Sequence, residues 1–362
     1  MCSVRIWCSP CLPVCGSLGF DMTAMAASPA EAETVISEFL NRCGLVTLGE
    51  PTRLVPLTGG VASDIFRVEV GERTFVVKKA LARLRVAQEW NAPVSRNKSE
   101  VGWFIEARRA VPHAVPDIIA HDPDLGVFAM TYLDPARHPI WKDELRDGRA
   151  RPAFASAVGQ TIATIHNATA HSAEAARRFA NDETFHAIRL EPYLEATARR
   201  HGDLAEELFA LSRATIQSKV VMVHGDVSPK NILAGPAGPV LLDAECAWYG
   251  EPAFDLAFCL NHLLLKCVWK RPHATDYLAC FDALASSYLS RVCWEAPESV
   301  EVRAARLLPA LFLGRIDGKS PAEYITAEAD RELVRRVARH LIVSRPRQLS
   351  QIRQDWAREV LN

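Results

Sequence analysis

The chain has 362 residues, of which 49% are hydrophobic and 23% are charged, and its formal net charge is −1. This composition is typical of a soluble globular protein, and the length suits two domains or one large bilobal domain. The nearly neutral charge balance argues against binding to nucleic acid or to a membrane surface. No run of about 18 uncharged apolar residues occurs, so no transmembrane helix is expected.

The N-terminal segment is set apart by its cysteines, since four of the ten fall within the first fifteen residues. Cys8 and Cys11 have the spacing of half a zinc site, but no second Cys/His pair lies at suitable spacing nearby. Helical periodicity begins only after Ser28, so we expect residues 1–27 to be a disordered leader or a non-native start. The other six cysteines lie in apolar segments, which indicates buried free thiols, a reducing compartment and a cytoplasmic location.

The first third of the remaining chain alternates between helical and β-type patterns. Apolar residues at helical spacing indicate one helix, and short segments rich in branched residues, separated by glycines, indicate strands. The expected elements are a helix over 30–43, strands over 53–57, 65–70 and 74–78, a helix over 96–109, and strands over 117–120 and 127–132.

The rest of the chain is mainly helical. Helices are expected over 154–170, 183–199, 204–219, 254–269, 274–289 and 300–313, with an amphipathic pair after Pro321. Short strands are expected over 219–223, 231–234 and 240–243. The order predicts an α+β, bilobal fold, with a small β-rich N-terminal lobe over 28–132 and a larger, mainly helical C-terminal lobe over 133–362.

The most informative stretch reads H-G-D-V-S-P-K-N from His224 to Asn231. Further along the chain, three apolar residues, Val240 to Leu242, stand directly before Asp243. Asp226 is placed to take a proton from a substrate hydroxyl, whereas Asn231 and Asp243 supply the oxygen ligands that Mg²⁺ prefers. Each residue type alone is common, but the ordered set predicts a phosphoryl-transfer site. Glu245 is either a second metal ligand or only a surface acid.

Two features of the N-terminal lobe fit the same chemistry. Gly59-Gly60 and Ser63 belong to a loop between strands whose backbone amides can approach phosphates, although an ordinary hairpin turn fits as well. Lys78 ends a predicted strand, where it can reach the α- and β-phosphates of ATP if an acid orients it. Glu100 is preferred to Glu106 as that acid. The alternative is that Lys78 and Lys79 are simply two solvated charges at the end of a strand.

Two further polar residues are expected to be structural. His224 can be interpreted as a base, but a role in holding the loop through backbone hydrogen bonds fits better. Asp255 begins a predicted helix and is expected to brace the catalytic loop through backbone amides. A Ser/His/Asp triad is not indicated, because Ser228 has no G-x-S-x-G setting.

These residues resemble the aminoglycoside phosphotransferase and choline kinase superfamily, which shares the protein-kinase-like fold. The resemblance extends from about residue 33 to the C-terminus. It implies that Asp226 is the catalytic base and that Asn231 and Asp243 bind magnesium. It also implies that Lys78 contacts the ATP phosphates and that Glu100 is its partner.

The same resemblance identifies Met130–Leu133 as the interlobe hinge, where the backbone of Met130 and Tyr132 receives adenine. Several segments are more closely similar to the methylthioribose kinase branch: Phe75–Leu81, Tyr132–Pro135, Arg178–Glu183, Glu191–Tyr193 and Tyr249-Gly250 with Phe254-Asp255. Asp243-x-Glu245 is similar to the D-P-E of that branch, which favours Glu245 as a ligand.

The chain also departs from that branch. Its catalytic run differs from H-G-D-L-H-T-G-S, and Gly314–Lys319 only partly resembles the arginine-containing substrate segment. Arg315 is therefore a candidate substrate residue, and a surface arginine at a helix end is the alternative.

Together these features predict an ATP- and Mg²⁺-dependent kinase that phosphorylates a hydroxyl of a small molecule, with a ribose-like sugar such as methylthioribose considered first. Aminoglycosides, macrolides and choline are alternative acceptors for the same chemistry. A nucleotide-binding pseudokinase that acts as an interaction module is the alternative of another class. Neither nucleic acid nor membrane is expected as a partner, and the oligomeric state is open.

Overall fold

The computed structural model describes residues 29–47, 49–57, 63–81 and 96–361. The expectations for the leader and for Gly59-Gly60 lie outside these residues. The described chain divides into two compact units, one taking in residues up to 101 and 116–135, the other taking in 102–115 and 136 onward. The expected lobe boundary between residues 132 and 133 stays a prediction.

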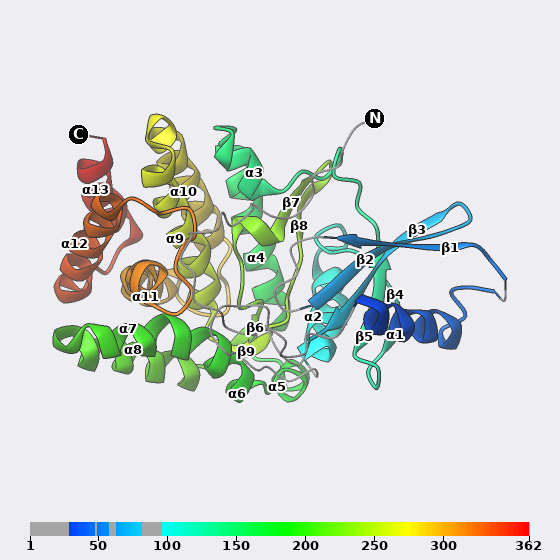
Figure 1. The fold of residues 1–362 in the computed structure, drawn as a ribbon. Coiled ribbons are helices and arrows are strands. Elements are labelled where there is room, and N and C mark those ends of the chain that lie inside the picture. The colour runs from blue at the N-terminus through cyan, green and yellow to red at the C-terminus, as the bar shows by residue number, and fades with distance from the viewer. Residues whose placement is uncertain (1–28, 48, 58–62, 82–95, 362) are drawn as a thin grey trace, which may run out of the picture. The chain divides into compact units, whose positions relative to one another are not determined.

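The smaller unit is built on one antiparallel sheet with the strand order β1-β2-β3-β5-β4. Its elements are α1 (Pro29–Arg42), β1 (Thr52–Leu57), β2 (Ser63–Val70), β3 (Arg73–Ala80), the start of α2 (Arg96–Ala110), β4 (Ile118–Asp122) and β5 (Val127–Thr131). α1 lies against the sheet (Figure 1), because Ile36 and Phe39 pack on apolar residues such as Val68 and Val77. Alternating branched residues thus give the sheet one buried face.

The larger unit is mainly helical and carries two short antiparallel strand pairs, β6 with β9 and β7 with β8. Its helices are α3 (Trp141–Arg146), α4 (Pro152–Thr169), α5 (Ala173–Arg178), α6 (Asp182–Phe185), η1 (His186–Glu195), α7 (Ala196–Arg200), η2 (Gly202–Leu204), α8 (Ala205–Gln217), η3 (Pro229–Asn231), α9 (Pro252–Trp269), η4 (Arg271–His273), α10 (Ala274–Leu289), α11 (Pro297–Asp317), α12 (Glu328–Ser344) and α13 (Leu349–Val360). The strands are β6 (Val221–Val223), β7 (Ile232–Gly235), β8 (Gly238–Leu241) and β9 (Trp248–Gly250).

α9 is the central helix of this unit and packs against α4, α10 and α11 (Figure 1). Every residue from Pro252 to Val268 is buried. A helix that is apolar on all sides is expected at the centre of a large core. Its buried polar residues are therefore exceptions, and Asp255, His262 and Lys266 are three of them.

The predicted α+β architecture, with a β-rich part and a larger helical part, is confirmed. The helix expected over 183–199 is instead a short α6, a π-helical η1 and a short α7. Pro192 lies inside η1 and has no N–H to donate, so regular α-helical bonding is interrupted there. The sequence analysis missed α3, α5 and β9, which are too short to show a period.

The cysteine prediction holds for most of the described thiols. Four are buried and unpaired, namely Cys246, Cys259, Cys267 and Cys280, and burial raises the pKa of each. Cys43 is half-buried. Cys293 is exposed, so the prediction of a buried thiol is wrong for this residue. Cys293 lies in the segment after α10, where its thiol is 2.9 Å from Oδ1 of Asn167.

Among the residues that the structure describes, no helix combines the length and the apolar character that crossing a membrane requires.

α11 and η1 approach each other so closely at Gly314 that a Cβ there would lie 2.4 Å from the carbonyl oxygen of Tyr193. We expect Gly314→Ala to lower the free energy of unfolding by about 1–3 kcal/mol, because the backbone of η1 must shift. Urea denaturation followed by circular dichroism measures this loss. Gly202→Ala is the control, since a Cβ there meets nothing within 4 Å. Equal losses in both variants would contradict the close approach.

Candidate active site

The smaller unit brings Lys78 and Glu100 together as a buried ion pair. Nζ of Lys78 lies 2.8 Å from Oε1 of Glu100, and the two residues are 3% and 1% exposed. A buried charge needs a partner of opposite sign, so each side chain holds the other in place. Glu106 pairs with Arg109 and Arg178 instead, which agrees with the choice of Glu100.

The other residues predicted to bind ATP lie around the same sheet. Ser63 begins β2, is buried, and has a hydroxyl oxygen with no hydrogen-bond partner among the described residues. Met130 lies on β5 opposite Val76, two positions before Lys78 on β3. Tyr132 follows β5, and the guanidinium of Arg67 lies 5.8 Å from its ring centroid.

In the larger unit, Asp226 lies in the loop between β6 and η3 and is 5% exposed. The loop requires glycine at position 225, where φ is +79° and a Cβ would lie 2.7 Å from the carbonyl oxygen of Cys246. Nδ2 of Asn231 donates to the carbonyl of Asp226 at 3.1 Å. The amide nitrogen is thus engaged, which leaves the amide oxygen of Asn231 as the atom able to bind a cation.

The side chain of Asp255 binds the backbone of this loop, as the sequence predicted. Its carboxylate accepts hydrogen bonds from the N–H groups of His224 at 2.7 Å and Gly225 at 2.8 Å. Nε2 of His166 lies 3.2 Å from the same carboxylate. Burial acts to raise the pKa of Asp255, but the hydrogen bond and charge of His166, with smaller contributions from His224, lower it below its ordinary value.

His224 has both ring nitrogens engaged with the backbone. Nδ1 accepts from the N–H of Asp226 at 3.1 Å, and Nε2 lies 3.0 Å from the carbonyl oxygen of Leu242, to which it donates. Burial lowers the pKa of His224 despite nearby acids. A neutral imidazole that is held in this way has a structural role and is not placed to act as a base.

Asp243 is held next to this loop by two hydrogen bonds of Leu242. The N–H of Leu242 donates to the carbonyl of Asn231 at 2.9 Å, and its carbonyl accepts from His224. Asp243 has a left-handed φ of +66°, a conformation that costs about 1 kcal/mol or more in a residue with a Cβ. Such a conformation persists only where surrounding contacts hold it, and it often marks a functional site.

The oxygen donors of this region fit Mg²⁺. Within the described residues, no three His, Cys, Asp or Glu side chains gather closely enough to hold a metal by themselves. Mg²⁺ commonly takes only one or two carboxylates and completes its shell with water and substrate phosphates. Asn231 and Asp243 carry oxygen atoms that could act as such ligands, and the half-buried Glu245 follows two residues after Asp243.

Two cations beside Asp226 were missed by the sequence analysis. Nη2 of Arg189 lies 3.0 Å and Nζ of Lys230 lies 3.2 Å from Oδ2 of Asp226. Arg189 comes from η1 and also donates through Nε to the carbonyl of Gly225. Asp226 raises the pKa of Lys230. Lys230 lies inside the catalytic run and could have been singled out there, whereas Arg189 has no local signal.

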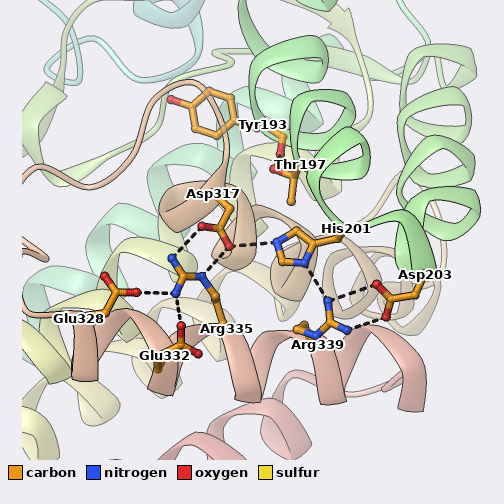
Figure 2. A network of polar contacts seen from close by, with 9 residues as sticks. All are labelled: Tyr193, Thr197, His201, Asp203, Asp317, Glu328, Glu332, Arg335 and Arg339. Carbon is orange, nitrogen blue, oxygen red and sulfur yellow. Dashed lines mark hydrogen bonds and ion pairs between the residues drawn. The ribbon is translucent and has the colours of Figure 1, made fainter.

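Arg315 is 7% exposed, so the surface alternative for this residue is wrong. Its Nη1 donates to the carbonyl and the hydroxyl of Ser320 and lies 3.5 Å from the hydroxyl oxygen of Tyr193. Figure 2 shows the contacts of Asp317, which lies two residues after Arg315 at the end of α11. Asp317 accepts from His201 at 2.9 Å and from Arg335 of α12 at 2.8 Å. The segment around Arg315 is therefore fixed in place.

The segments that resemble the methylthioribose kinase branch have mainly packing roles here. Asn181 donates to the carbonyl of Ala247, and Asp182 accepts from Nε1 of Trp248 at 2.6 Å, so both hold β9. Glu191 pairs with Arg199 and Lys319. Tyr193 is different, since the guanidinium groups of Arg189 and Arg315 lie 6.0 and 5.8 Å from its ring centroid.

Comparison with known protein families gives one match over most of the chain. The sequence profile of the phosphotransferase enzyme family APH matches residues 53–266. The methylthioribose kinase of Escherichia coli O45:K1 is 27% identical over 247 residues, which cover 60% of this chain and 58% of that enzyme. Methylthioribose kinase 2 of Oryza sativa subsp. japonica is 23% identical over 294 residues, covering 69% and 68%. The chain thus spans less than two thirds of the bacterial relative's length.

Solved structures support the fold alone. The choline kinase from Cryptosporidium parvum Iowa II superposes with a TM-score of 0.54 at 13% identity, over 91% of this chain and 100% of that one. The Plasmodium vivax ethanolamine kinase has a TM-score of 0.52 at 11% identity, over 92% of each chain.

The Asp255 contacts predict a pH-dependent loss of stability in Asp255→Asn. Asparagine would turn its NH₂ group toward one of two backbone donors, so the free energy of unfolding should fall by about 2–4 kcal/mol near neutral pH. The pKa of Asp255 is lowered in the folded protein, so its contribution is present above the unfolded pKa of about 3.9 and disappears as the pH falls through the folded value. The difference from wild type should therefore narrow below about pH 4.

Urea denaturation between pH 7 and pH 2.5 measures this difference. Asp282→Asn is the matched control, because Asp282 is 52% exposed and its partner Arg353 is 3.2 Å away. Its effect should stay below about 1 kcal/mol. A difference between wild type and Asp255→Asn that is as large at pH 3 as at pH 7 would contradict the assignment.

Proposed function

Since the chain belongs to the APH phosphotransferase enzyme family, we propose that it is an ATP- and Mg²⁺-dependent kinase that transfers the γ-phosphate of ATP to a hydroxyl of a small molecule. One observation carries the proposal. A single loop, braced by Asp255, presents Asp226 and Asn231, and backbone hydrogen bonds hold Asp243 next to it. A carboxylate for the acceptor and oxygen ligands for a metal are what in-line phosphoryl transfer requires.

In this proposal Asp226 orients the acceptor hydroxyl and takes its proton. Arg189 and Lys230 both contact Oδ2 of Asp226, so they fix the carboxylate and lie where negative charge develops on the transferring group. Mg²⁺, bound by Asn231 and Asp243 with Glu245 as a further candidate, would offset the charge of the triphosphate.

In the smaller unit, we assign the α- and β-phosphates to Lys78 and the orientation of Lys78 to Glu100, and the buried ion pair between them supports this assignment. We assign Ser63, with the loop that precedes it, to the phosphates, and the backbone of Met130 and Tyr132 to adenine. These assignments also underlie the division into an ATP-binding lobe and a catalytic lobe.

For the acceptor we propose a ribose-like sugar, with methylthioribose tested first because the curated relatives carry that name. One observation disfavours the alternatives. Arg189 and Lys230 contact Asp226, and Arg315 lies against the ring of Tyr193, whereas aminoglycosides and choline are cationic. Like charges close together in a partly buried site oppose binding.

We expect purified protein with ATP and Mg²⁺ to release ADP with at least one sugar in a panel of hydroxylated metabolites, aminoglycosides and choline. With that acceptor, Asp226→Asn should lower kcat by about 10²-fold or more while ATP still binds, because the carboxylate acts on the acceptor. ADP release and calorimetric titration with ATP measure the two effects. Full activity of the variant would remove Asp226 from the mechanism.

Asp243→Ala should abolish Mg²⁺-dependent binding of nucleotide, because the triphosphate then lacks its main counter-charge. Glu245→Ala should weaken this binding less, as expected for a further ligand. Calorimetry with ATP, with and without Mg²⁺, compares the two variants. Equal losses would mean that both acids are primary ligands, and no loss in Asp243→Ala would contradict the metal assignment.

A further inference from the structure

Lys266 is a buried cation that the proposed phosphoryl transfer does not use. It lies near the end of α9 and is 1% exposed. Its Nζ lies 3.7 Å from the ring centroid of Tyr324 and 4.2 Å from that of Trp269. Within the described part of the chain it makes no hydrogen bond and no ion pair. Ring faces attract a positive charge, but they do not replace the acceptors that an ammonium group needs for its three N–H bonds.

Two neighbouring side chains also have donors without acceptors. The hydroxyl of Tyr324 and Nε of Arg315 are buried and have no hydrogen-bond partner among the described residues. Glu323 connects them, because it precedes Tyr324 and its carboxylate lies 4.0 Å from Nη2 of Arg315. An ammonium, a guanidinium and a phenol hydroxyl form a set of donors that suits an oxyanion.

His262 links this set to the catalytic loop. It lies one turn before Lys266 on α9, and its ring is 5.3 Å from that of Phe258. Burial lowers the pKa of His262 well below its ordinary value, and the charges of Arg315, Lys266 and Lys230 act in the same direction. Lys230 itself contacts Asp226. The ring of Phe258 also lies 5.8 Å from the guanidinium of Arg189, which contacts Asp226, so the basic residues extend from Lys266 toward the proposed catalytic carboxylate.

The acid nearest to the donors of Lys266, Arg315 and Tyr324 is Glu323, which lies on their exposed side. Glu323 is 58% exposed and pairs with Lys142 of α3 at 2.5 Å. The charge of Asp143 also acts to raise the pKa of Lys266, but Asp143 is paired with Arg146 at 2.8 Å. The buried side therefore holds cations whose charge is not matched by the acids around them.

We propose that Lys266, Arg315 and Tyr324 bind an anionic group of the acceptor, either a carboxylate or a phosphate ester, while a hydroxyl of the same molecule is presented to Asp226. This rests on the proposed function, because it names the acceptor class of the same site. It also separates this chain from its curated relatives, since methylthioribose is neutral and should be a poorer acceptor than an acidic sugar.

A structural role for Lys266 makes a different prediction. If the ammonium stabilises the core through the two rings, Lys266→Met should lower the melting temperature. If it is kept for an anion, the apolar side chain relieves the burial of a charge, and the melting temperature should be unchanged or higher. Thermal denaturation of the two proteins without ligand distinguishes these roles.

The decisive experiment compares matched acceptors in the ADP-release assay. Ribose, glycerol and glucose are the neutral members, ribonate, glycerate and gluconate the carboxylates, and ribose 5-phosphate the phosphate ester. We expect anionic members to be preferred, and Lys266→Met to raise their KM by about tenfold or more with a smaller change in kcat. Lys270→Met is the control, because Lys270 stacks on Trp269 at 5.5 Å, outside the set, and should change neither constant.

Two further measurements do not depend on turnover. Glu323→Gln removes the nearest acid and should tighten anion binding, the reverse of Lys266→Met. Calorimetric titration with gluconate and with ribose 5-phosphate should show this tighter binding in Glu323→Gln and weaker binding in Lys266→Met.

The outcomes separate the two proposals. Turnover of neutral or cationic acceptors only, or unchanged anion affinity in Lys266→Met, would overturn the anion site and leave the kinase standing. If no acceptor releases ADP, the proposed function fails, and calorimetric binding of the two anions then decides the anion site alone. If Lys266→Met does not fold, Glu323→Gln decides, because unchanged anion affinity in it would overturn the proposal. Preference for gluconate or for ribose 5-phosphate identifies the anion.

Discussion

The candidate site depends on one buried carboxylate. Asp255 lies in the first turn of α9 and accepts the N–H groups of two consecutive residues, His224 and Gly225, which determine where Asp226 follows. A carboxylate that accepts several directed hydrogen bonds in a core is costly to replace, because any neutral substitute leaves a buried donor unsatisfied. A helix that is buried from Pro252 to Val268 thereby fixes the loop that carries the proposed chemistry.

The same helix carries a second ion near its other end, and the two are in very different surroundings. Moving one ion out of water costs several kcal/mol. Asp255 recovers this cost through backbone donors and His166, whereas Lys266 has two aromatic faces, worth about 2 kcal/mol when desolvated. The contacts of Lys266 with the described residues therefore do not offset the free energy that its burial costs. A residue with this balance is more readily explained by binding than by stability.

Much of the catalytic loop could be predicted from the sequence because its residues lie in one short stretch with fixed spacing. Glu100 could be preferred because it lies early in a periodic helix that follows the strand of Lys78. Arg189 could not be found, because its approach to Asp226 depends on a π-helix that propensities do not indicate. The burial of Arg315 and Lys266 was equally hidden, since a helix-end cation in sequence gives no sign of what packs over it.

The π-helical η1 has a consequence for how this family member can change. A π-helical stretch is related to an α-helix by the insertion of a residue, and each residue of an α-helix advances the side chain by about 100°. Loss of Pro192, which lies between Arg189 and Tyr193, would let the helix close into a regular α-helix, because it removes both the extra residue and the missing N–H. It would also rotate the guanidinium away from Asp226. Arg189 therefore stays beside Asp226 only as long as the helix keeps its extra residue.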